Sequence, residues 1–313
     1  MPDEQRKHKH HHKKKKRWWK WVLIALGLFL LIDSVIVGKL YFDAKKAVDV
    51  TYKAVKHDDK RTGSVSLDNG QPFSVLLLGS DTGEYGRTEQ GRSDTIMVAA
   101  VTPNKTELLS IPRDTLVTIA GHPGNNKINA AYSYDGVSGA LNTLQSYLDI
   151  PIDHYIEINM KGLEQLSEAI GPVKVDNDLE FTNLDVHFPK GEVTIDADNI
   201  LAYTRMRYED PRGDYGRQLR QRQVLTALVE KASSIDSLAK YHSILNAISA
   251  NMKTDLTFDD IKDIVTNYGG AKNIDQIQLK GNGQMIDGVS YEVVPKENLD
   301  EVRSQLKQTL KLK

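Results

Sequence analysis

Arginine is distributed unevenly along this chain. There are 13 Arg and 28 Lys, and six of the arginines lie between positions 205 and 222, in the segment TRMRYEDPRGDYGRQLRQRQ. Three more are Arg87, Arg92 and Arg113, and positions 114–204 contain none. Because a guanidinium can donate two parallel hydrogen bonds, clustered arginine is typical of sites that bind phosphate or carboxylate. The alternative is a surface cluster of salt bridges with three nearby acids, Glu209, Asp210 and Asp214.

The pattern around these arginines favours an anion site. If residues 203–208 form a strand, its period of two places Arg205 and Arg207 on one face. In the helix expected to follow, Arg217 and Gln221 continue the apolar stripe that should face the protein. Polar groups on an inward face need a partner, and an anion at a helix amino terminus is one. The other two arginines of this helix, Arg220 and Arg222, fall outside the stripe and are expected to be solvated.

Two acids could complement the arginines. Asp81 ends the first expected strand, in Gly-Ser-Asp, and Asp94 begins the second, in Gly-Arg-Ser-Asp. If these strands are neighbours in a sheet, both carboxylates lie near one edge. Two carboxylates alone are a weak metal site, but they suffice for Mg²⁺ when phosphate supplies further ligands. The alternative is that Asp81 caps a turn and Asp94 only precedes a strand.

Composition excludes several classes of protein. The chain of 313 residues is 40% hydrophobic and 27% charged, which is typical of a folded protein with a core. It contains no cysteine, so disulfides, thiolate metal sites and a Cys nucleophile are excluded. The phosphate loop GxxxxGK[ST], a strand-linked GxGxxG, HExxH and GxSxG are all absent. The standard nucleotide, dinucleotide, zinc-protease and hydrolase motifs are therefore not available.

The amino terminus predicts a membrane anchor. Residues 1–20 contain nine Lys or Arg and two acids, and a nearly uninterrupted apolar run follows to residue 40. A helix over residues 21–40 is long enough to cross a bilayer, and aromatic residues flank it at both ends. The charge of Asp33 is tolerable because it lies near the end of the span. The basic tail places the amino terminus in the cytoplasm and the rest of the chain outside the cell. A cleaved signal peptide would be shorter, and a buried core helix would not follow four consecutive lysines.

The remainder predicts a juxtamembrane stalk and one globular unit. Residues 41–72 carry mixed charge and end in a Gly/Ser/Asn/Pro-bearing stretch, which is typical of a helical stalk and a linker. Residues 73–313 alternate short apolar runs with amphipathic patterns, which predicts an α/β sandwich. We expect strands near 73–80, 95–101, 106–114, 274–280 and 290–294, and helices near 137–148, 160–170, 216–232, 236–249, 257–268 and 296–311.

The motifs together resemble those of the LytR-CpsA-Psr family of cell-wall enzymes of Gram-positive bacteria. The resemblance covers about residues 73–235 and rests on LLLGSD, GRSDTIMV, SIPRDT, KINAAY and LAYTRMRYEDPRGDYGRQLRQRQV. It implies an αβα fold with a hydrophobic pocket for a polyprenyl chain and the pyrophosphate at its mouth. It also implies transfer of a lipid-linked anionic glycan, such as teichoic acid or capsular polysaccharide, to the muramic acid 6-hydroxyl of peptidoglycan.

The resemblance implies roles for individual positions. The carboxylates of Asp81 and Asp94 correspond to ligands of Mg²⁺, or of Mn²⁺ in its place. The implied catalytic set is Asp81, Asp94, Arg92 and Arg113. The implied pyrophosphate-binding set is Arg92, Arg113, Lys127, Asn129, Arg205, Arg207, Arg217 and Gln221. The implied partners are the polyprenyl-pyrophosphate-linked donor, peptidoglycan and the lipid bilayer, with no nucleic acid.

Alternatives remain open at this point. Either Asp81 or Asp94 could accept the proton of the attacking hydroxyl. Water could replace the glycan hydroxyl, which would make the protein a pyrophosphatase of polyprenyl-linked intermediates. A membrane-bound transcriptional regulator with the basic tail on DNA is a third hypothesis, although twenty residues without a helix-turn-helix cannot easily read bases. The sequence does not specify which polymer is transferred.

Overall fold

The structure is a computed structural model that describes residues 35, 37–58, 60–61, 63–81, 91–232 and 240–312. The chain divides into two units, residues 1–44 and 45–313. In the first unit the described residues, 35 and 37–44, are helical. No helix within the described residues is both long and apolar enough to span a bilayer. Most of the predicted membrane segment, residues 21–40, lies outside the described residues.

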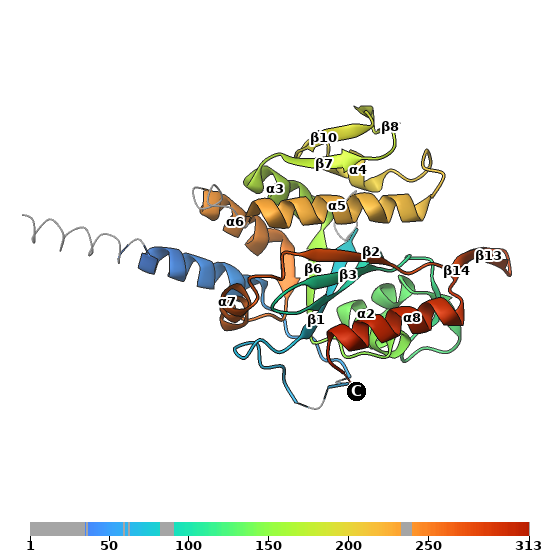
Figure 1. The fold of residues 1–313 in the computed structure, drawn as a ribbon, viewed down its shortest axis with the longest axis horizontal. Coiled ribbons are helices and arrows are strands. Elements are labelled where there is room, and N and C mark those ends of the chain that lie inside the picture. The colour runs from blue at the N-terminus through green and yellow to red at the C-terminus, as the bar shows by residue number, and fades with distance from the viewer. Residues whose placement is uncertain are drawn as a thin grey trace, which may run out of the picture. The chain divides into compact units, whose positions relative to one another are not determined.

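A six-stranded mixed sheet forms the centre of the second unit (Figure 1). In order across the sheet its strands are β11 (Met252–Thr254), β6 (His154–Asn159), β1 (Phe73–Ser80), β2 (Ser93–Val101), β3 (Thr106–Ser110) and β12 (Ile274–Gln278). β1 pairs antiparallel with β2 and parallel with β6. The end of β1 therefore lies beside the beginning of β2, so the positions of Asp81 and Asp94 meet at one edge, as the sequence predicted.

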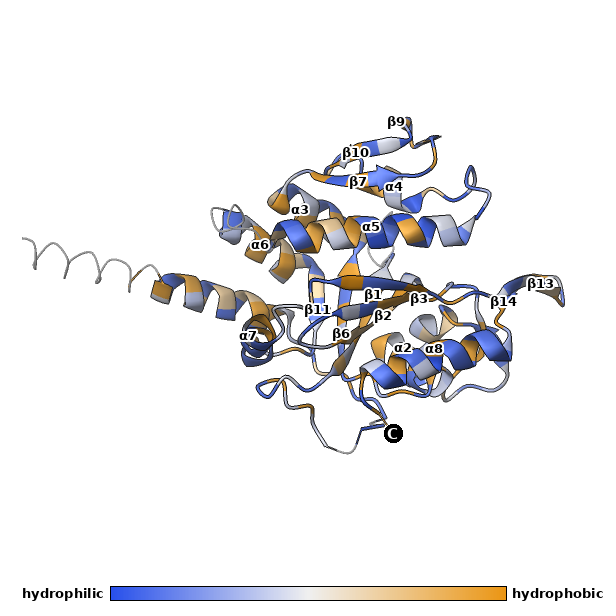
Figure 2. Ribbon diagram, viewed as in Figure 1, coloured by the Kyte–Doolittle hydropathy of each residue, from blue (hydrophilic) through white to orange (hydrophobic). Residues whose placement is uncertain are grey.

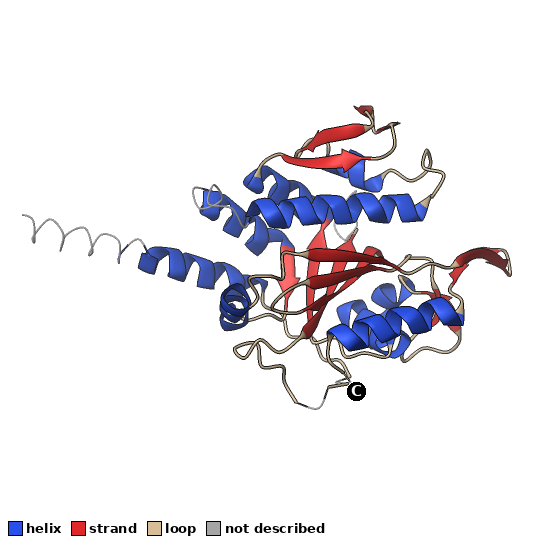
Figure 3. Cartoon of the chain, in the orientation of Figure 1, coloured by secondary structure: helices blue, strands red, loops and turns tan. Residues whose placement is uncertain are grey.

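Helices cover both faces of this sheet (Figure 3). Alternate residues of β1 point to opposite faces, so Leu76 and Leu78 join one core cluster while Phe73 and Val75 join another. The first cluster includes α2 and α8, and the second includes α5 and α7. The bounds of these helices are α2 (Ala130–Leu148), α8 (Lys296–Thr309), α5 (Asp214–Ala232) and α7 (Phe258–Asn267).

A third core lies on the far side of α5 and is built from short elements. It is formed by α3 (Met160–Ile170), β7 (Val173–Asn177), β8 (Phe181–Asn183), β9 (Val186–Phe188), β10 (Gly191–Ile195) and α4 (Ile200–Arg205). Val224 and Leu228 of α5 belong to this core, while Leu225 packs against the core on the sheet side. α5 is thus enclosed between two layers, and Figure 2 shows polar and apolar residues mixed along its length.

Five further elements complete the fold. They are the hairpin of β4 (Leu116–Thr118) and β5 (Asn125–Lys127), the hairpin of β13 (Asn282–Ile286) and β14 (Val289–Val293), and helix α6 (Tyr241–Asn251) beside α3. The helix α2 is kinked, because Asp135 and Gly136 have non-helical backbone angles and Gly136 has a φ of 60°. The regular helical path is therefore interrupted at these two residues.

Most predicted elements occur close to the expected positions. The helix expected at 216–232 is α5, and the strand expected at 106–114 ends earlier, at Ser110, shortly before Pro112. The segment that follows the stalk helix is fastened to the globular body rather than loose. Asn142 accepts a hydrogen bond from the Asp58 amide at 2.8 Å, and Arg61 pairs with Asp153 at 2.6 Å.

Candidate anion-binding site

The site begins where β1 ends. Ser80 pairs with Ser93 after a register shift, which brings the next residue, Asp81, against the chain that enters β2. The Arg92 amide donates to Asp81 Oδ1 at 2.8 Å, and the Asp81 amide donates to the Arg92 carbonyl at 3.4 Å. An added Cβ on Gly91 would lie 1.8 Å from Asp81 Oδ1. Glycine at position 91 is therefore what allows the Asp81 carboxylate to occupy this place.

Asp94 connects the sheet edge to two arginines. Arg113 Nη1 donates to Asp94 Oδ2 at 2.6 Å, and Arg217 Nη2 donates to the Asp94 carbonyl oxygen at 3.0 Å. Arg217 Nη2 also lies 2.7 Å from Asp214 Oδ1, in the first turn of the same helix. Residues from β2, from the segment after β3 and from α5 thus meet at Asp94, Arg113 through its carboxylate and Arg217 through its backbone carbonyl.

The β4–β5 hairpin adds another cation. Lys127, the last residue of β5, pairs with Asp114 at 2.8 Å, and its ammonium lies 5.8 Å from the centre of the Tyr291 ring. The backbone amide of Asn129 donates to the Arg113 carbonyl at 3.2 Å, which places Asn129 next to the segment that follows β3. The KINAAY motif therefore lies beside the segment that carries Arg113 and Asp114, while its role in binding pyrophosphate stays a prediction.

The cations lie close enough to repel one another. Burial lowers the pKa of Arg217; Asp214 opposes this effect, while the positive charges of Arg113 and Arg207 lower the pKa further. Burial also disfavours the charge of Arg113, but the carboxylates of Asp94 and two other acids outweigh it and raise its pKa. Mutual repulsion between guanidinium groups is relieved when an anion binds between them.

Several buried polar atoms around these charges have no hydrogen-bond partner among the described residues. They are Ser93 Oγ, Arg113 Nε, Asn129 Oδ1, Arg217 Nε and Gln221 Oε1. Buried polar groups are rarely left without partners, because each one costs about 1–3 kcal/mol. The orphaned atoms come from four separate segments, and Arg113 and Arg217 each contribute one of them. This arrangement is typical of a site that a polar ligand completes.

The prediction of a strand at residues 203–208 is wrong. Arg205 is the last residue of α4, and Arg207 follows in the next turn, with both side chains partly buried. The buried residues Ile200, Tyr203 and Met206 recur every three positions, which is a helical spacing that the alternating side chains of the segment conceal. Arg207 still lies near Arg217, as its effect on the pKa of Arg217 indicates.

The prediction that Arg220 and Arg222 are solvated is also wrong. Their exposed fractions are 1% and 5%, because α5 is covered on both sides. Arg220 Nη1 donates to Asp210 Oδ2 at 2.7 Å, so the salt-bridge interpretation applies to this arginine. Arg222 donates to two neutral side chains of β12, Gln276 at 3.0 Å and Gln278 at 2.9 Å.

The remaining predicted residues can be placed as follows. The side chain of Arg92 is exposed at the rim of the site, whereas Arg217 is only 6% exposed. Gln221 lies one turn after Arg217, and its amide makes a long contact of 3.4 Å with the Thr204 carbonyl. Arg87 belongs to residues 82–90, which lie outside the described part of the chain.

Sequence reasoning missed two groups of the site, Asp114, which pairs with Lys127, and Tyr215, which donates to Glu292 of β14 at 2.5 Å. Asp214, which the sequence offered only as part of a surface salt-bridge cluster, pairs with Arg217. The separation of three residues between Asp214 and Arg217 on one helix was an available signal for their pairing. Nothing in the sequence links Tyr215 to Glu292, because the two are 77 positions apart.

The residues at the sheet edge fit Mg²⁺ only as a shared ion. Within the described residues no group of three or more His, Cys, Asp or Glu side chains is arranged to hold a metal. Asp81 and Asp94 offer hard carboxylate oxygens, and the Gly91 cradle fixes the first of them. Mg²⁺ is commonly held by one or two carboxylates with phosphates and water as the other ligands. The donor set therefore fits a metal that arrives with a phosphorylated substrate.

Comparison with known proteins decides the family. The model of the LytR_cpsA_psr family matches residues 38–308. The chain belongs to the LytR-CpsA-Psr family. The family resemblance inferred from the motifs is thus confirmed, and the match extends beyond residues 73–235 to nearly the whole globular unit.

Individual members of the LytR-CpsA-Psr family cover almost the same length. A protein from Enterococcus faecalis named polyisoprenyl-teichoic acid–peptidoglycan teichoic acid transferase TagU is 47% identical over 296 residues, covering 93% of this chain and 97% of that protein. A solved structure from the same species, described as a transcriptional regulator, has a TM-score of 0.72 at 42% identity and covers 80% of this chain and 92% of its own. A structure of TagT bound to LI-WTA has a TM-score of 0.68 at 28% identity, covering 83% and 99%.

The solved structures also bear on the fold prediction. Their likeness over more than three quarters of this chain supports a mixed α/β fold of the LytR-CpsA-Psr type. Helices on both faces of the sheet agree with the layered architecture that the sequence predicted. The predicted transmembrane helix remains a prediction.

Proposed function

We propose that this protein transfers an anionic glycopolymer from a polyprenyl-pyrophosphate carrier to peptidoglycan. The observation that carries the proposal is the convergence of Arg113 and Arg217 on Asp94, at 2.6 and 3.0 Å, with several buried polar atoms that have no hydrogen-bond partner among the described residues. A pyrophosphate group has the charge and the acceptor oxygens that such a cluster lacks. The transferase name carried by the Enterococcus faecalis relative supports the same conclusion.

The reaction follows from the charges at the site. A hydroxyl oxygen of the acceptor attacks the phosphorus that carries the glycan, and the bond from this phosphorus to the bridging oxygen of the polyprenyl phosphate breaks. Polyprenyl phosphate leaves with the electron pair, and the glycan remains on the acceptor as a phosphodiester. Arg113 and Arg217 stabilise the negative charge that grows on the leaving phosphate. Arg205 and Arg207 hold the pyrophosphate from the end of α4.

The acceptor must also lose a proton, and either Asp81 or Asp94 receives it. Asp94 accepts a hydrogen bond from Arg113 at 2.6 Å, which orients its carboxylate. Asp81 is held by the Arg92 amide and lies at the rim, beside the chain that enters β2. When bound, Mg²⁺ supplies further charge neutralisation on the phosphate oxygens. Asp81 and Asp94 are the side chains that would hold it.

The proposal includes a membrane setting. A polyprenyl carrier resides in a lipid bilayer, and the apolar segment at residues 21–40 would keep the enzyme next to it. The basic tail of residues 1–20 would stay in the cytoplasm, so that the catalytic unit faces the cell wall. A single-pass anchor of this orientation places donor, enzyme and peptidoglycan on one side of the membrane.

Two substitutions test the assignment. Asp81→Ala and Arg205→Ala are expected to lower transfer of labelled polymer from a lipid-linked donor to peptidoglycan by at least about 100-fold, because each removes a charge from the transition state. Asp198→Asn, which alters an exposed acid between β10 and α4, is the matched control and is expected to stay within twofold. If either site variant is folded and transfers polymer at the unaltered rate, the site assignment is wrong.

The same assay separates transfer from the alternative activities. In a transferase the label enters the wall polymer, whereas in a pyrophosphatase it enters water-soluble phosphate. The similar structure described as a transcriptional regulator makes one further control worthwhile. A deletion of residues 1–20 that abolishes a specific promoter footprint, while glycopolymer transfer is absent from the intact protein, would favour regulation over catalysis.

A further inference from the structure

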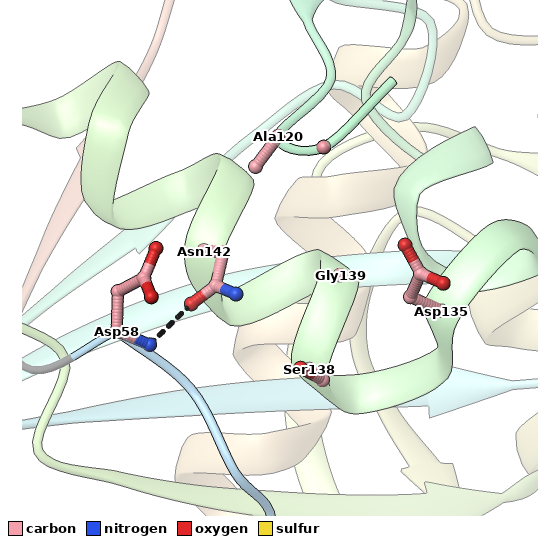
Figure 4. A pocket seen from close by; sticks show the side chains of 7 residues that line it. Asp58, Ala120, Asp135, Ser138, Gly139 and Asn142 are labelled. Atoms are coloured by element: carbon pink, nitrogen blue, oxygen red, sulfur yellow. Dashed lines mark hydrogen bonds between the residues drawn. The ribbon is translucent and has the colours of Figure 1, made fainter.

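A cavity lies outside the anion site. Its volume is about 390 Å³, within the range of about 300–1,000 Å³ that is typical of small-molecule sites. Three segments form it: the end of the stalk, the turn after β4 and the kinked part of α2. The residues that line it include Asp58, Ala120, Asp135, Ser138, Gly139 and Asn142 (Figure 4).

The walls of this cavity are fixed by hydrogen bonds. The Ser138 hydroxyl donates to the Lys56 carbonyl at 2.7 Å, and the Gln145 amide donates to the Asp58 carbonyl at 2.7 Å. With the bond from the Asp58 amide to Asn142, these contacts hold the stalk segment against α2. The wall is therefore preformed, although Asp58 itself is exposed.

The polar groups of the cavity are mainly acceptors. The carboxylate of Asp58 forms no hydrogen bond or ion pair with any described residue, and one oxygen of Asp135 is held by His122 Nε2 at 2.8 Å while the other has no described partner. In Figure 4 Asp58 and Asn142 lie on one side of the cavity and Asp135 on the other. Groups that donate hydrogen bonds, such as the hydroxyls and amides of a sugar, would match this lining.

An aromatic pair adjoins the cavity. His122 stacks on Tyr134 with 4.5 Å between the ring centres, and Tyr134 is 48% exposed. A half-exposed tyrosine presents an apolar face that can stack on a sugar ring. Asn126 donates to the Tyr134 hydroxyl at 2.9 Å and directly precedes Lys127 of the anion site. The cavity is thus connected to the reaction site through three neighbouring side chains.

We infer that this cavity binds a neutral sugar unit of the acceptor glycan, an inference that rests on the proposed function. Two carboxylates would repel the phosphates of an anionic polymer, so the donor polymer does not fit the charge of the cavity. The N-acetylhexosamine backbone of peptidoglycan is uncharged and carries both hydroxyl and amide donors. Binding one of its units here would hold the strand beside the site where its hydroxyl attacks.

The binding test uses the full-length protein in detergent and a tetramer of N-acetylglucosamine as the probe. Asp58→Asn, Asp135→Asn and the cavity-filling Ala120→Phe are each expected to weaken binding at least tenfold in calorimetry or ligand-observed NMR. Asp198→Asn again serves as the matched control and is expected to bind within twofold of the unaltered protein. Asp58 is exposed, so its substitution keeps the test valid if another variant fails to fold. Equal binding by Asp58→Asn and the unaltered protein would overturn the inference.

Two further measurements distinguish the sugar site from a cation site and from a failure of the proposed function. Titration with Ca²⁺ or Mg²⁺ alone tests for a cation; binding of a cation that depends on Asp135, together with no binding of the tetramer, refutes the sugar site. In transfer assays the cavity variants are expected to raise the KM for peptidoglycan strands at least fivefold and to leave the KM for the donor unchanged. If the unaltered protein transfers no polymer but binds the tetramer in this variant-dependent way, the proposed function fails and the sugar site stands.

Discussion

At the scale of single residues, we expect the site to depend on guanidinium geometry more than on charge. Arg217 uses one terminal nitrogen for both the Asp94 carbonyl and Asp214, while its Nε has no described partner. The planar group therefore ties β2 to α5 and still presents a donor to a ligand. A lysine ammonium carries the same charge but cannot span these positions with a fixed fork.

Arg217→Lys is accordingly expected to lower kcat/KM for polymer transfer by about 100-fold, a loss similar to that of removing one transition-state donor. The measurement is steady-state transfer of labelled polymer, with circular dichroism to verify the fold. Arg303→Lys is the control, because this partly buried arginine bonds to the Tyr147 carbonyl in the other half of the unit. Activity of Arg217→Lys within threefold of the unaltered enzyme would show that charge alone suffices.

At the scale of elements, α5 carries arginines of two kinds: one contacts the anion site and another holds a neighbouring turn in place. Arg217 faces the anion site, whereas Arg220 is buried against Asp210 in the turn that follows Arg207. Arg212 also bonds to Asp210, at 2.8 Å, so one carboxylate fixes the whole turn. Gly216 permits this packing, because a Cβ there would lie 1.8 Å from Asp210 Oδ2. The turn that carries Arg207 is thereby held on α5.

The buried Asp210 predicts a pH dependence of stability. Burial would raise its pKa, but hydrogen bonds from Arg212 and Arg220 prevail and lower it to about 2. A carboxyl whose pKa falls on folding stabilises the fold above its unfolded pKa of about 4, and this stabilisation is lost as the pH falls towards 2. A shift of nearly two units corresponds to about 2 kcal/mol.

Asp210→Asn should therefore lower the free energy of unfolding by at least about 2 kcal/mol at pH 6, and the difference from the unaltered protein should shrink between pH 4 and pH 2. Urea unfolding at pH 6, 4 and 3 measures both values. Asp198→Asn controls for the loss of one negative charge. A difference that stays constant over this pH range would mean that packing, not the ionised carboxylate, stabilises the turn.

How much the sequence could predict also becomes clear at this scale. Local signals were sufficient for β1, β2 and the long helices, whereas the pairing of β1 with β2 could be stated from the sequence only as a condition, which the fold fulfils. Local signals could not predict that Arg220 and Arg222 are buried. Whether a helix has one buried face or two depends on the layer that packs on its far side. The same holds for Tyr215 and Glu292, which meet only through the tertiary fold. The cavity beside Asp135 depends on a kink and on a stalk segment that no local pattern joins.

At the scale of the whole molecule, charge is separated along the chain. The formal net charge is -1, yet the first 20 residues are strongly basic and the remainder is acidic. Within that acidic remainder the cations Arg113, Lys127 and Arg217 converge at one end of the sheet. An anionic donor would thus meet a local potential opposite in sign to that of the surrounding domain.

The boundary between the two units yields a prediction about truncation. Ala47, Val48 and Thr51 are buried, the Lys53 amide donates to the Thr254 carbonyl at 2.7 Å, and the buried Tyr155 hydroxyl donates to the Lys53 carbonyl at 2.7 Å. A chain of residues 45–313 keeps all these contacts and is expected to retain the thermal unfolding midpoint of the longer protein. A chain that begins at residue 55 exposes apolar surface and leaves the Tyr155 hydroxyl unpaired, at a cost of about 3 kcal/mol.

For a domain of this size that cost corresponds to a decrease of roughly 5–10 °C in the unfolding midpoint. Differential scanning calorimetry of the two truncated chains at equal concentration measures it. Lys53→Ala in the longer truncation is the matched control, because it removes a side chain while both backbone hydrogen bonds remain, and it should unfold like its parent. Equal midpoints for the chains that begin at residues 45 and 55 would mean that the stalk is only a tether. A lower midpoint for the shorter chain would make the stalk part of the folded unit, and would explain how it can form a wall of the cavity at Asp58.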